Sequence, residues 1–146
     1  MAVVCSPLFP SRATLFSNPR VGYERTLAAM SNPPTGWHTI TPRIFAEDPE
    51  GLVDFIKQTF RATGDYQATR PSEIRIGDSM LMISGTEFRP RQTACLYVYV
   101  SDVDEVFERS VAAGVKVIES PTKMPYGDRR CTVEDGWGNV WQIATR

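Results

Sequence analysis

The sequence predicts an α+β fold in which two tandem βαβββ modules form a curved, partly closed sheet with their helices on its outer face. Two observations carry this prediction. The order of one strand, one helix and three further strands occurs twice, and each helix begins at an aspartate, Asp48 or Asp102. Each module presents an apolar face to its helix, so two modules side by side enclose a cleft on the opposite face. Module one covers residues 37–86 and module two covers 93–146.

Module one begins with a predicted strand at residues 37–47, which is rich in Thr, Ile and Phe. Asp48 followed by Pro49 is typical of an N-cap and first helical position. Apolar residues recur at helical spacing over 52–60, and Gly64 predicts the end of this helix. Three short strands follow, at 65–69, 73–76 and 79–84.

Module two repeats this order, beginning with a predicted strand at residues 93–100. Asp102 and Glu105 have the spacing of a capping box, and Gly114 predicts the end of the second helix. The Gly-containing segment 135–138 separates two β-rich runs and predicts a hairpin turn. The three strands after the helix are expected at 115–119, 129–134 and 139–145.

The closing segment also resembles a known family. A Tyr126-Gly-Asp-Arg run, then an acidic residue and a Gly138-Asn139 pair leading into an aromatic strand, is similar to the last hairpin of the glyoxalase/bleomycin-resistance/dioxygenase (vicinal oxygen chelate) superfamily. The resemblance covers roughly residues 37–146. It implies a glyoxalase-like arrangement of paired modules, a ligand cleft on the concave face and a homodimer.

The composition of the chain indicates which kinds of binding partner to expect. The chain has 146 residues, of which 42% are hydrophobic, as expected of one globular domain. Sixteen basic and seventeen acidic residues give a net charge of −1, which does not favour binding to nucleic acid or to an anionic membrane surface. No apolar run approaches the roughly 20 residues that span a bilayer. The three cysteines lack metal-type spacing and favour reduced thiols in the cytoplasm. We expect a small organic ligand as partner.

Residues 1–36 differ in character from the rest and are assigned to an N-terminal extension and linker. Their basic, proline-containing composition leaves three interpretations open. The segment is a non-catalytic extension, an organelle-targeting peptide, or translated sequence upstream of a start at Met30.

Strand alternation predicts which side chains face the cleft. Cys95, Tyr97 and Tyr99 alternate with an aliphatic row that suits the helix. In the last hairpin, pairing Glu134 with Asn139 places Cys131 opposite Gln142. The same pairing turns Arg129 into the cleft and Arg130 away from it, and a slip of one residue reverses the two arginines.

The resemblance also implies where a metal would bind. Metal-binding members place ligands on the first, fourth, fifth and eighth strands, and these positions correspond here to Thr41, Met82, Cys95 and Gln142. A divalent metal needs about three good N, O or S ligands, so no metal cofactor is predicted. These four residues are expected to form the cleft floor, and the predicted ligand contacts are Arg43, Tyr97, Tyr99 and Arg129.

Simpler structural roles compete with these assignments. Cys95 is more often a small packed side chain than a nucleophile. Tyr97 and Tyr99 either contact a flat ligand or fill the floor of the cleft. Arg43 and Arg129 either meet an anionic ligand or form salt bridges to Glu73 or Glu134.

The predicted function is binding of an aromatic or anionic small molecule without a metal. The alternative is a lyase, isomerase or dioxygenase of the same superfamily, either metal-dependent or metal-free. The sequence assigns no catalytic residue and does not identify the ligand.

Overall fold

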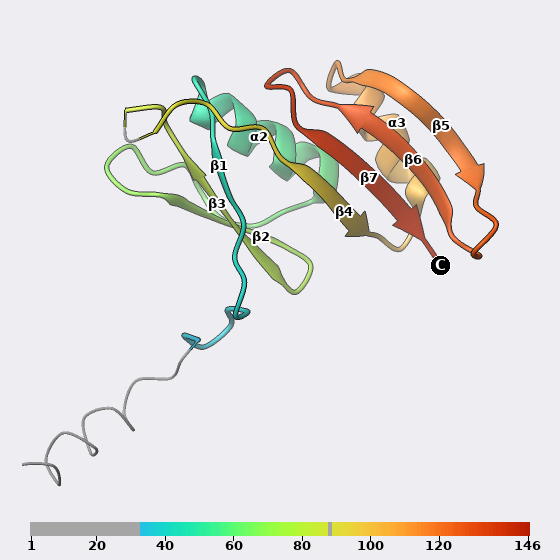
Figure 1. Cartoon of the computed structure of the whole chain (residues 1–146), viewed down its shortest axis with the longest axis horizontal. Helices are drawn as coiled ribbons and strands as arrows, with labels where there is room; N and C mark the ends of the chain where they lie inside the picture. The colour runs from blue at the N-terminus through green and yellow to red at the C-terminus, as the bar shows by residue number, and fades with distance from the viewer. Residues whose placement is uncertain (1–32, 88) are drawn as a thin grey trace, which may run out of the picture. The chain divides into compact units, whose positions relative to one another are not determined.

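The computed structural model describes residues 33–87 and 89–146, and Pro33–Arg146 form one compact unit (Figure 1). Of the N-terminal extension and linker assigned to residues 1–36, residues 1–32 lie outside the described part of the chain. The described part contains two helices and seven strands in two sheets, which confirms the α+β class and the two modules. Figure 1 shows both helices on the same side of the sheets.

Module one forms a three-stranded sheet in the order β1-β3-β2. Strand β1 runs parallel to β3, and β2 runs antiparallel to it. The helix begins as predicted, because the Asp48 carboxylate accepts a 3.0 Å hydrogen bond from Gly51 N and Pro49 occupies the first turn. The elements of this module are β1 (Arg43–Phe45), α2 (Pro49–Phe60), β2 (Ser72–Ile76) and β3 (Ser79–Ser84).

Three predictions for module one are wrong in detail. The strand expected at 37–47 is short, because regular sheet pairing begins only at Arg43. Residues 65–69 form no strand, and an isolated bridge between Thr63 and Arg75 extends the sheet instead. Helix α2 ends before Gly64, because Arg61 already adopts a left-handed conformation with φ of 54°.

Module two forms a four-stranded sheet in the order β4-β7-β6-β5. Strand β4 runs parallel to β7, and the other neighbours are antiparallel. The Asp102 carboxylate caps the helix by accepting hydrogen bonds from the backbone N–H groups of Asp104 and Glu105. The elements are β4 (Cys95–Tyr99), α3 (Val103–Ala112), β5 (Lys116–Lys123), β6 (Arg129–Glu134) and β7 (Val140–Thr145).

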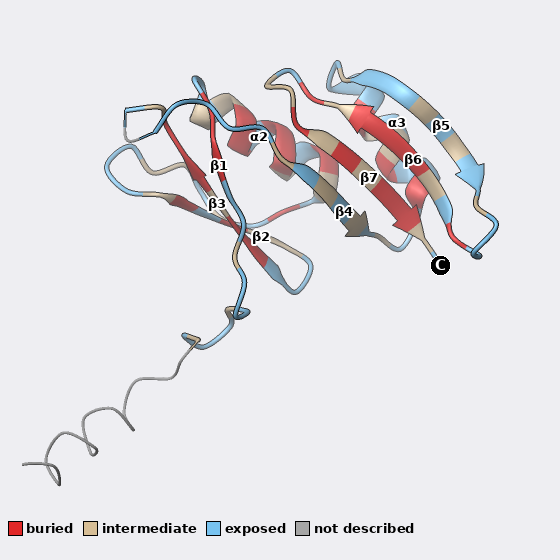
Figure 2. Ribbon diagram, in the orientation of Figure 1, coloured by how far each residue is buried: buried red, intermediate tan, exposed pale blue. Residues whose placement is uncertain are grey.

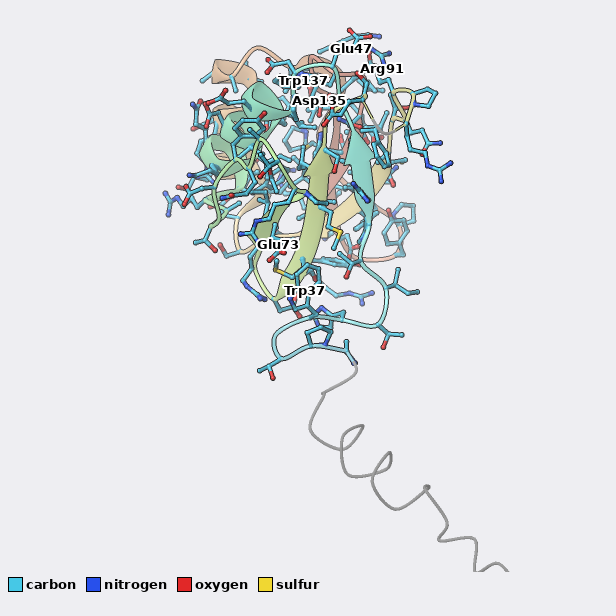
Figure 3. All side chains as sticks on the ribbon, turned by 90° about the vertical axis from the view of Figure 1, so that its left-hand side faces the viewer. Trp37, Glu47, Glu73, Arg91, Asp135 and Trp137 are labelled. Atoms are coloured by element: carbon cyan, nitrogen blue, oxygen red, sulfur yellow. The ribbon has the colours of Figure 1, made fainter. Side chains whose placement is uncertain are left out.

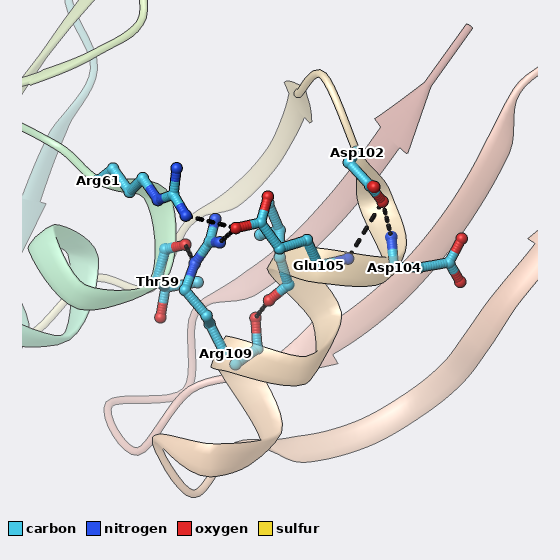
Figure 4. Close-up of polar contacts among 8 residues, drawn as sticks. Thr59, Arg61, Asp102, Asp104, Glu105 and Arg109 are labelled. Carbon is cyan, nitrogen blue, oxygen red and sulfur yellow. Dashed lines mark hydrogen bonds and ion pairs between the residues drawn. The ribbon is translucent and has the colours of Figure 1, made fainter.

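Glu105 joins the two helices rather than completing the predicted capping box. Its carboxylate forms an ion pair with Arg61, at the end of α2, and a second one of 2.6 Å with Arg109 (Figure 4). Arg109 Nε also donates a 2.8 Å hydrogen bond to the Thr59 carbonyl. The end of α2 is therefore tied to the exposed side of α3.

The two modules share one hydrophobic core beneath the helices. Trp141 of β7 is fully buried, and its ring lies 4.9 Å from Phe60 and 6.3 Å from Phe55, both of α2 (centroid distances). Figure 2 shows buried residues in both helices and in β6 and β7, while most of β5 is exposed. Trp141 and Ile143 are both fully buried, so one face of β7 packs beneath the helices.

The register of the last hairpin differs from the prediction by one residue. Glu134 pairs with Val140 rather than with Asn139, so the buried Cys131 lies opposite Ile143, and Thr132 lies opposite Gln142. The turn is longer because Asn139 belongs to it: its side-chain amide donates to Asp135 and its side-chain oxygen accepts from Ala94 N.

This register exchanges the faces of the sheet on which the two arginines of β6 were predicted to lie. Arg129 shares the face of Cys131 and makes a bidentate pair with Asp104 of α3, with both N···O distances 2.8 Å. Arg130 shares the opposite face with Ala144. The prediction that Arg129 faces the cleft is therefore wrong, and the one-residue alternative holds.

Candidate functional site

The face of module two opposite α3 carries the predicted aromatic residues. Pairing of β4 with β7 places Tyr97 opposite Gln142 and Tyr99 opposite Ala144, whereas Leu96 lies opposite the buried Trp141. Cys95 shares the face of the two tyrosines, as the alternation predicted. Tyr97 and Tyr99 remain 40% and 60% exposed. Aromatic surface is therefore available to a ligand.

A pocket of the described residues lies where module one meets β4. We call it the main cavity, and its volume is about 420 Å³. Tyr97 and Tyr99 form part of its wall. The segment before β1 contributes Ile40, which is 82% exposed, and Pro42. The complete lining is His38, Ile40, Pro42, Ile76, Gly77, Asp78, Ser79, Met80, Leu81, Leu96, Tyr97, Val98 and Tyr99.

Polar groups lie at one end of the main cavity, around the turn between β2 and β3. Ser79 Oγ donates a 2.8 Å hydrogen bond to Asp78. This bond holds the pKa of the Asp78 carboxyl below its ordinary value, and the charge of His38 acts in the same direction. This part of a mostly apolar cavity therefore carries a carboxylate.

Asp128 fixes the hydroxyl groups of the two tyrosines. Asp128 is 1% exposed, and its Oδ2 accepts hydrogen bonds of 2.9 Å from Tyr97 and 3.0 Å from Tyr99. The two rings lie 5.1 Å apart. Burial, followed by hydrogen bonding to Tyr126 and Asp128, raises the pKa of Tyr97. The hydrogen bond to Asp128 is the main cause of the raised pKa of Tyr99.

A second, more open pocket of about 360 Å³ is also lined by Tyr97 and Tyr99. Arg146 Nε approaches Asp128 Oδ1 at 3.3 Å, and its side chain is 72% exposed. We call this site the tyrosine pocket, lined by Tyr97, Tyr99, Tyr126, Asp128 and Arg146.

Arg130, next to the tyrosine pocket, is already paired. Its guanidinium donates to Glu119 at 2.6 Å and to the Tyr126 hydroxyl at 3.3 Å. Glu119 also accepts a hydrogen bond from Thr132. The Arg130 bond is the main reason why the pKa of Glu119 lies below its ordinary value. The charge of Arg130 is therefore compensated within the protein.

Arg43 does not form the salt bridge to Glu73 or Glu134 that was the alternative role predicted for it. Its Nε and Nη2 atoms donate to Ser84 Oγ at 3.0 and 2.8 Å, and its guanidinium lies 4.8 Å from the centre of the Phe45 ring. Within the described residues Arg43 forms no ion pair with a carboxylate, Glu73 included. Figure 3 shows Glu73 among the other side chains of module one.

Only two of the eight predicted site residues line the pockets, namely Tyr97 and Tyr99. Arg129 lies on the α3 side of its sheet. The predicted residues that line neither pocket are Thr41, Arg43, Met82, Cys95, Gln142 and Arg129.

Several lining residues were missed by the sequence analysis. His38, Ile40 and Pro42 alternate with Thr41 along the chain, so the prediction chose the wrong face of this segment. Asp128 lies within the Tyr126-Gly-Asp-Arg run that carried the family resemblance. That run was therefore a signal for Asp128, although its tyrosine partners could not be read from it.

The four positions implied for a metal do not fit a divalent ion. Thr41 Oγ1 donates a long hydrogen bond to the His38 carbonyl, and Met82 offers only a thioether. Cys95 is exposed, and Gln142 is a neutral amide. Across residues 33–87 and 89–146, no three His, Cys, Asp or Glu side chains converge in a way that could hold a metal ion. Neither described helix is long and apolar enough to cross a bilayer.

Comparison with known proteins places this fold. The crystal structure of TioX from Micromonospora sp. ML1 is 25% identical, with a TM-score of 0.64 over 73% of this chain and 96% of that one. A glyoxalase/bleomycin resistance protein/dioxygenase family enzyme from Burkholderia phytofirmans PsJN is 20% identical, with a TM-score of 0.63 over 72% of this chain and 95% of that one. The similarity of this second structure supports the assignment of the fold.

Sequence comparison agrees. The uncharacterized protein MT0910 of Mycobacterium tuberculosis (strain CDC 1551 / Oshkosh) is 23% identical over 150 residues, covering 87% of this chain and 85% of that protein. The family model described as Glyoxalase/Bleomycin resistance protein/Dioxygenase superfamily matches residues 18–143. Together with the βαββ and βαβββ modules of the fold, this match shows that the chain belongs to the glyoxalase/bleomycin resistance protein/dioxygenase superfamily.

Proposed function

We propose that this protein binds a small aromatic or anionic organic ligand in the main cavity without a metal ion. The main cavity carries the proposal, because about 420 Å³ lies within the range of pockets that hold drug-sized molecules. Most of its wall is apolar, with polar groups gathered near Asp78. An apolar wall with a few convergent polar groups is the usual composition of such a site.

The aromatic part of the proposal is supported by Tyr97 and Tyr99. Their hydroxyl groups are fixed by Asp128, so the rings are held in place before a ligand arrives. Fixed rings lose little conformational entropy on binding, which favours stacking against a flat ligand.

The anionic part is supported by Arg43. Its donors reach only the neutral hydroxyl of Ser84 within the described residues. A guanidinium without a carboxylate partner can bind a carboxylate or phosphate of a ligand. Arg43 lines neither pocket, so the anionic group of such a ligand would extend beyond the main cavity to reach it.

The metal-free part is supported by donor chemistry. Thr41, Met82, Cys95 and Gln142 offer no pair of imidazole or carboxylate ligands. Elemental mass spectrometry after incubation with manganese, iron, cobalt, nickel and zinc tests it. About one tightly held ion per chain after desalting would overturn this part and favour a metal-dependent enzyme of the superfamily.

Ligand binding is tested by a thermal-shift screen of aromatic and anionic compounds, with calorimetry of the hits. Ile40→Asp should weaken binding about tenfold or more, because it places a charge on the apolar wall. Ile118→Asp is the matched control, since Ile118 is 51% exposed and lies outside both pockets. Equal affinities in the two variants would place the ligand outside the main cavity.

A further inference from the structure

The tyrosine pocket combines exposed aromatic rings with a buried carboxylate. Tyr99 and Tyr126 are 60% and 51% exposed, whereas Asp128 beneath them is 1% exposed. Asp128 Oδ2 accepts both phenol hydroxyls on β4, but Oδ1 accepts no hydrogen bond from any described residue. A buried carboxylate oxygen without a hydrogen bond is costly, and a cationic N–H donor would satisfy it.

Arg146 shows which chemistry suits this position. Its Nε lies 3.3 Å from Asp128 Oδ1, close enough for an ion pair but without the geometry of a hydrogen bond. The Arg146 side chain is 72% exposed, so little packing holds its guanidinium there. A cation is therefore placed at the carboxylate by the chain itself, and it is held weakly.

The surrounding charges do not oppose a cation. Arg130 is the other guanidinium nearby, and Glu119 compensates it at 2.6 Å. Arg129 lies on the opposite face of the sheet, paired with Asp104. Displacing the exposed Arg146 would leave the carboxylate as the uncompensated charge of the pocket.

We propose that the tyrosine pocket binds an organic cation, an amidinium, guanidinium or ammonium group, whose N–H donors reach Asp128 Oδ1. The tyrosine rings favour the same ligand, because the negative faces of aromatic rings attract cations. Arg146 occupies the site in the absence of this ligand and competes with it. The site goes beyond the proposed function and does not depend on it, since Tyr126, Asp128 and Arg146 do not line the main cavity.

Benzamidinium and benzamide test the proposal, because they have nearly the same shape and differ in charge. Binding to the full chain is followed by NMR titration of the tyrosine ring signals. Benzamidinium should bind about tenfold more tightly than benzamide, since only the cation makes a charge-assisted hydrogen bond. Equal affinities of the two compounds would overturn the proposal.

Two variants and a control locate the site. Asp128→Asn should remove the preference for benzamidinium, and Arg146→Gln should tighten its binding about threefold or more by removing the competing cation. Arg129→Gln removes an equal charge from the other face and should change nothing. If Asp128→Asn does not fold, Arg146→Gln decides, because its side chain is exposed: unchanged or weaker binding of benzamidinium would refute the proposal.

Discussion

The indole Nε1 of Trp141 donates a 2.9 Å hydrogen bond to the buried Asp135 Oδ2. The other oxygen of Asp135 accepts from the backbone N–H groups of Trp137 and Asn139, which closes the hairpin turn. Figure 3 shows Asp135 and Trp137 at the same end of the described unit as Glu47 and Arg91. One carboxylate therefore connects the turn to the largest side chain of the core.

Asp135→Ala should destabilise the protein by about 2–4 kcal/mol, because it leaves buried donors of Asn139 and Trp141 without acceptors. Urea unfolding measures the free energy of unfolding. Asp65→Ala is the control, since its side chain is 82% exposed and, among the described residues, its carboxylate pairs only with Lys57. A free energy of unfolding close to that of the control would show that the hydrogen bonds accepted by Asp135 do not stabilise the fold.

Arg130→Ala should lower the urea midpoint more than Arg129→Ala. The Arg130 side chain is 16% exposed and is the hydrogen-bond partner of Glu119, whereas the pair of Arg129 with Asp104 is about half exposed. Unfolding of the two variants under identical conditions gives the comparison. A larger loss for Arg129→Ala would contradict the orientation of both side chains.

The raised pKa values of Tyr97 and Tyr99 make stability depend on alkaline pH. In the folded state the pKa of each phenol lies above the ordinary value of 10.0. Their contribution to stability is fully present below that pH and is lost as the pH rises through the raised values. Ultraviolet titration of the native protein should find tyrosines that ionise later than ordinary ones.

Asp128→Asn separates the two tyrosines in the same titration. Hydrogen bonding to Asp128 is the main cause for Tyr99, whereas burial is the main cause for Tyr97. The variant should therefore return Tyr99 closer to its ordinary pKa than Tyr97. Identical titration curves for the variant and the parent would show that Asp128 has no influence on the phenols.

Cys95 and Cys131 should differ in their reactivity with iodoacetamide. Cys95 is exposed, whereas Cys131 is fully buried, and burial raises the pKa of its thiol to about 11. At about pH 8 the native protein should be alkylated at Cys95 and protected at Cys131, because the thiolate is the reactive form. Peptide mass spectrometry identifies the modified residue. In urea both should react, and rapid native labelling of Cys131 would contradict the observed register.

Local chemistry was enough to predict most elements. Asp48 and Asp102 cap the helices in the structure because an N-cap bond joins residues two or three positions apart. The alternation of β4 depends only on the period of a strand, so the shared face of Tyr97 and Tyr99 was predicted correctly.

Contacts between distant segments decided the rest. The hairpin register depends on Asn139, whose side chain accepts a hydrogen bond from Ala94 N, 45 positions away. The main cavity brings together Ile40 and Pro42, which precede β1, and Tyr97 and Tyr99 of β4.

Asp128 illustrates the same division. The sequence places it in a glycine-containing run, where an aspartate is ordinarily a turn residue. Its partners Tyr97 and Tyr99 lie 31 and 29 positions earlier in the chain, on strand β4, whereas Asp128 itself directly precedes β6. Helix capping and the period of a strand depend on residues within a few positions of one another, so the sequence alone predicts them. A pocket forms where segments far apart in the sequence pack together, and no local sequence pattern predicts that packing.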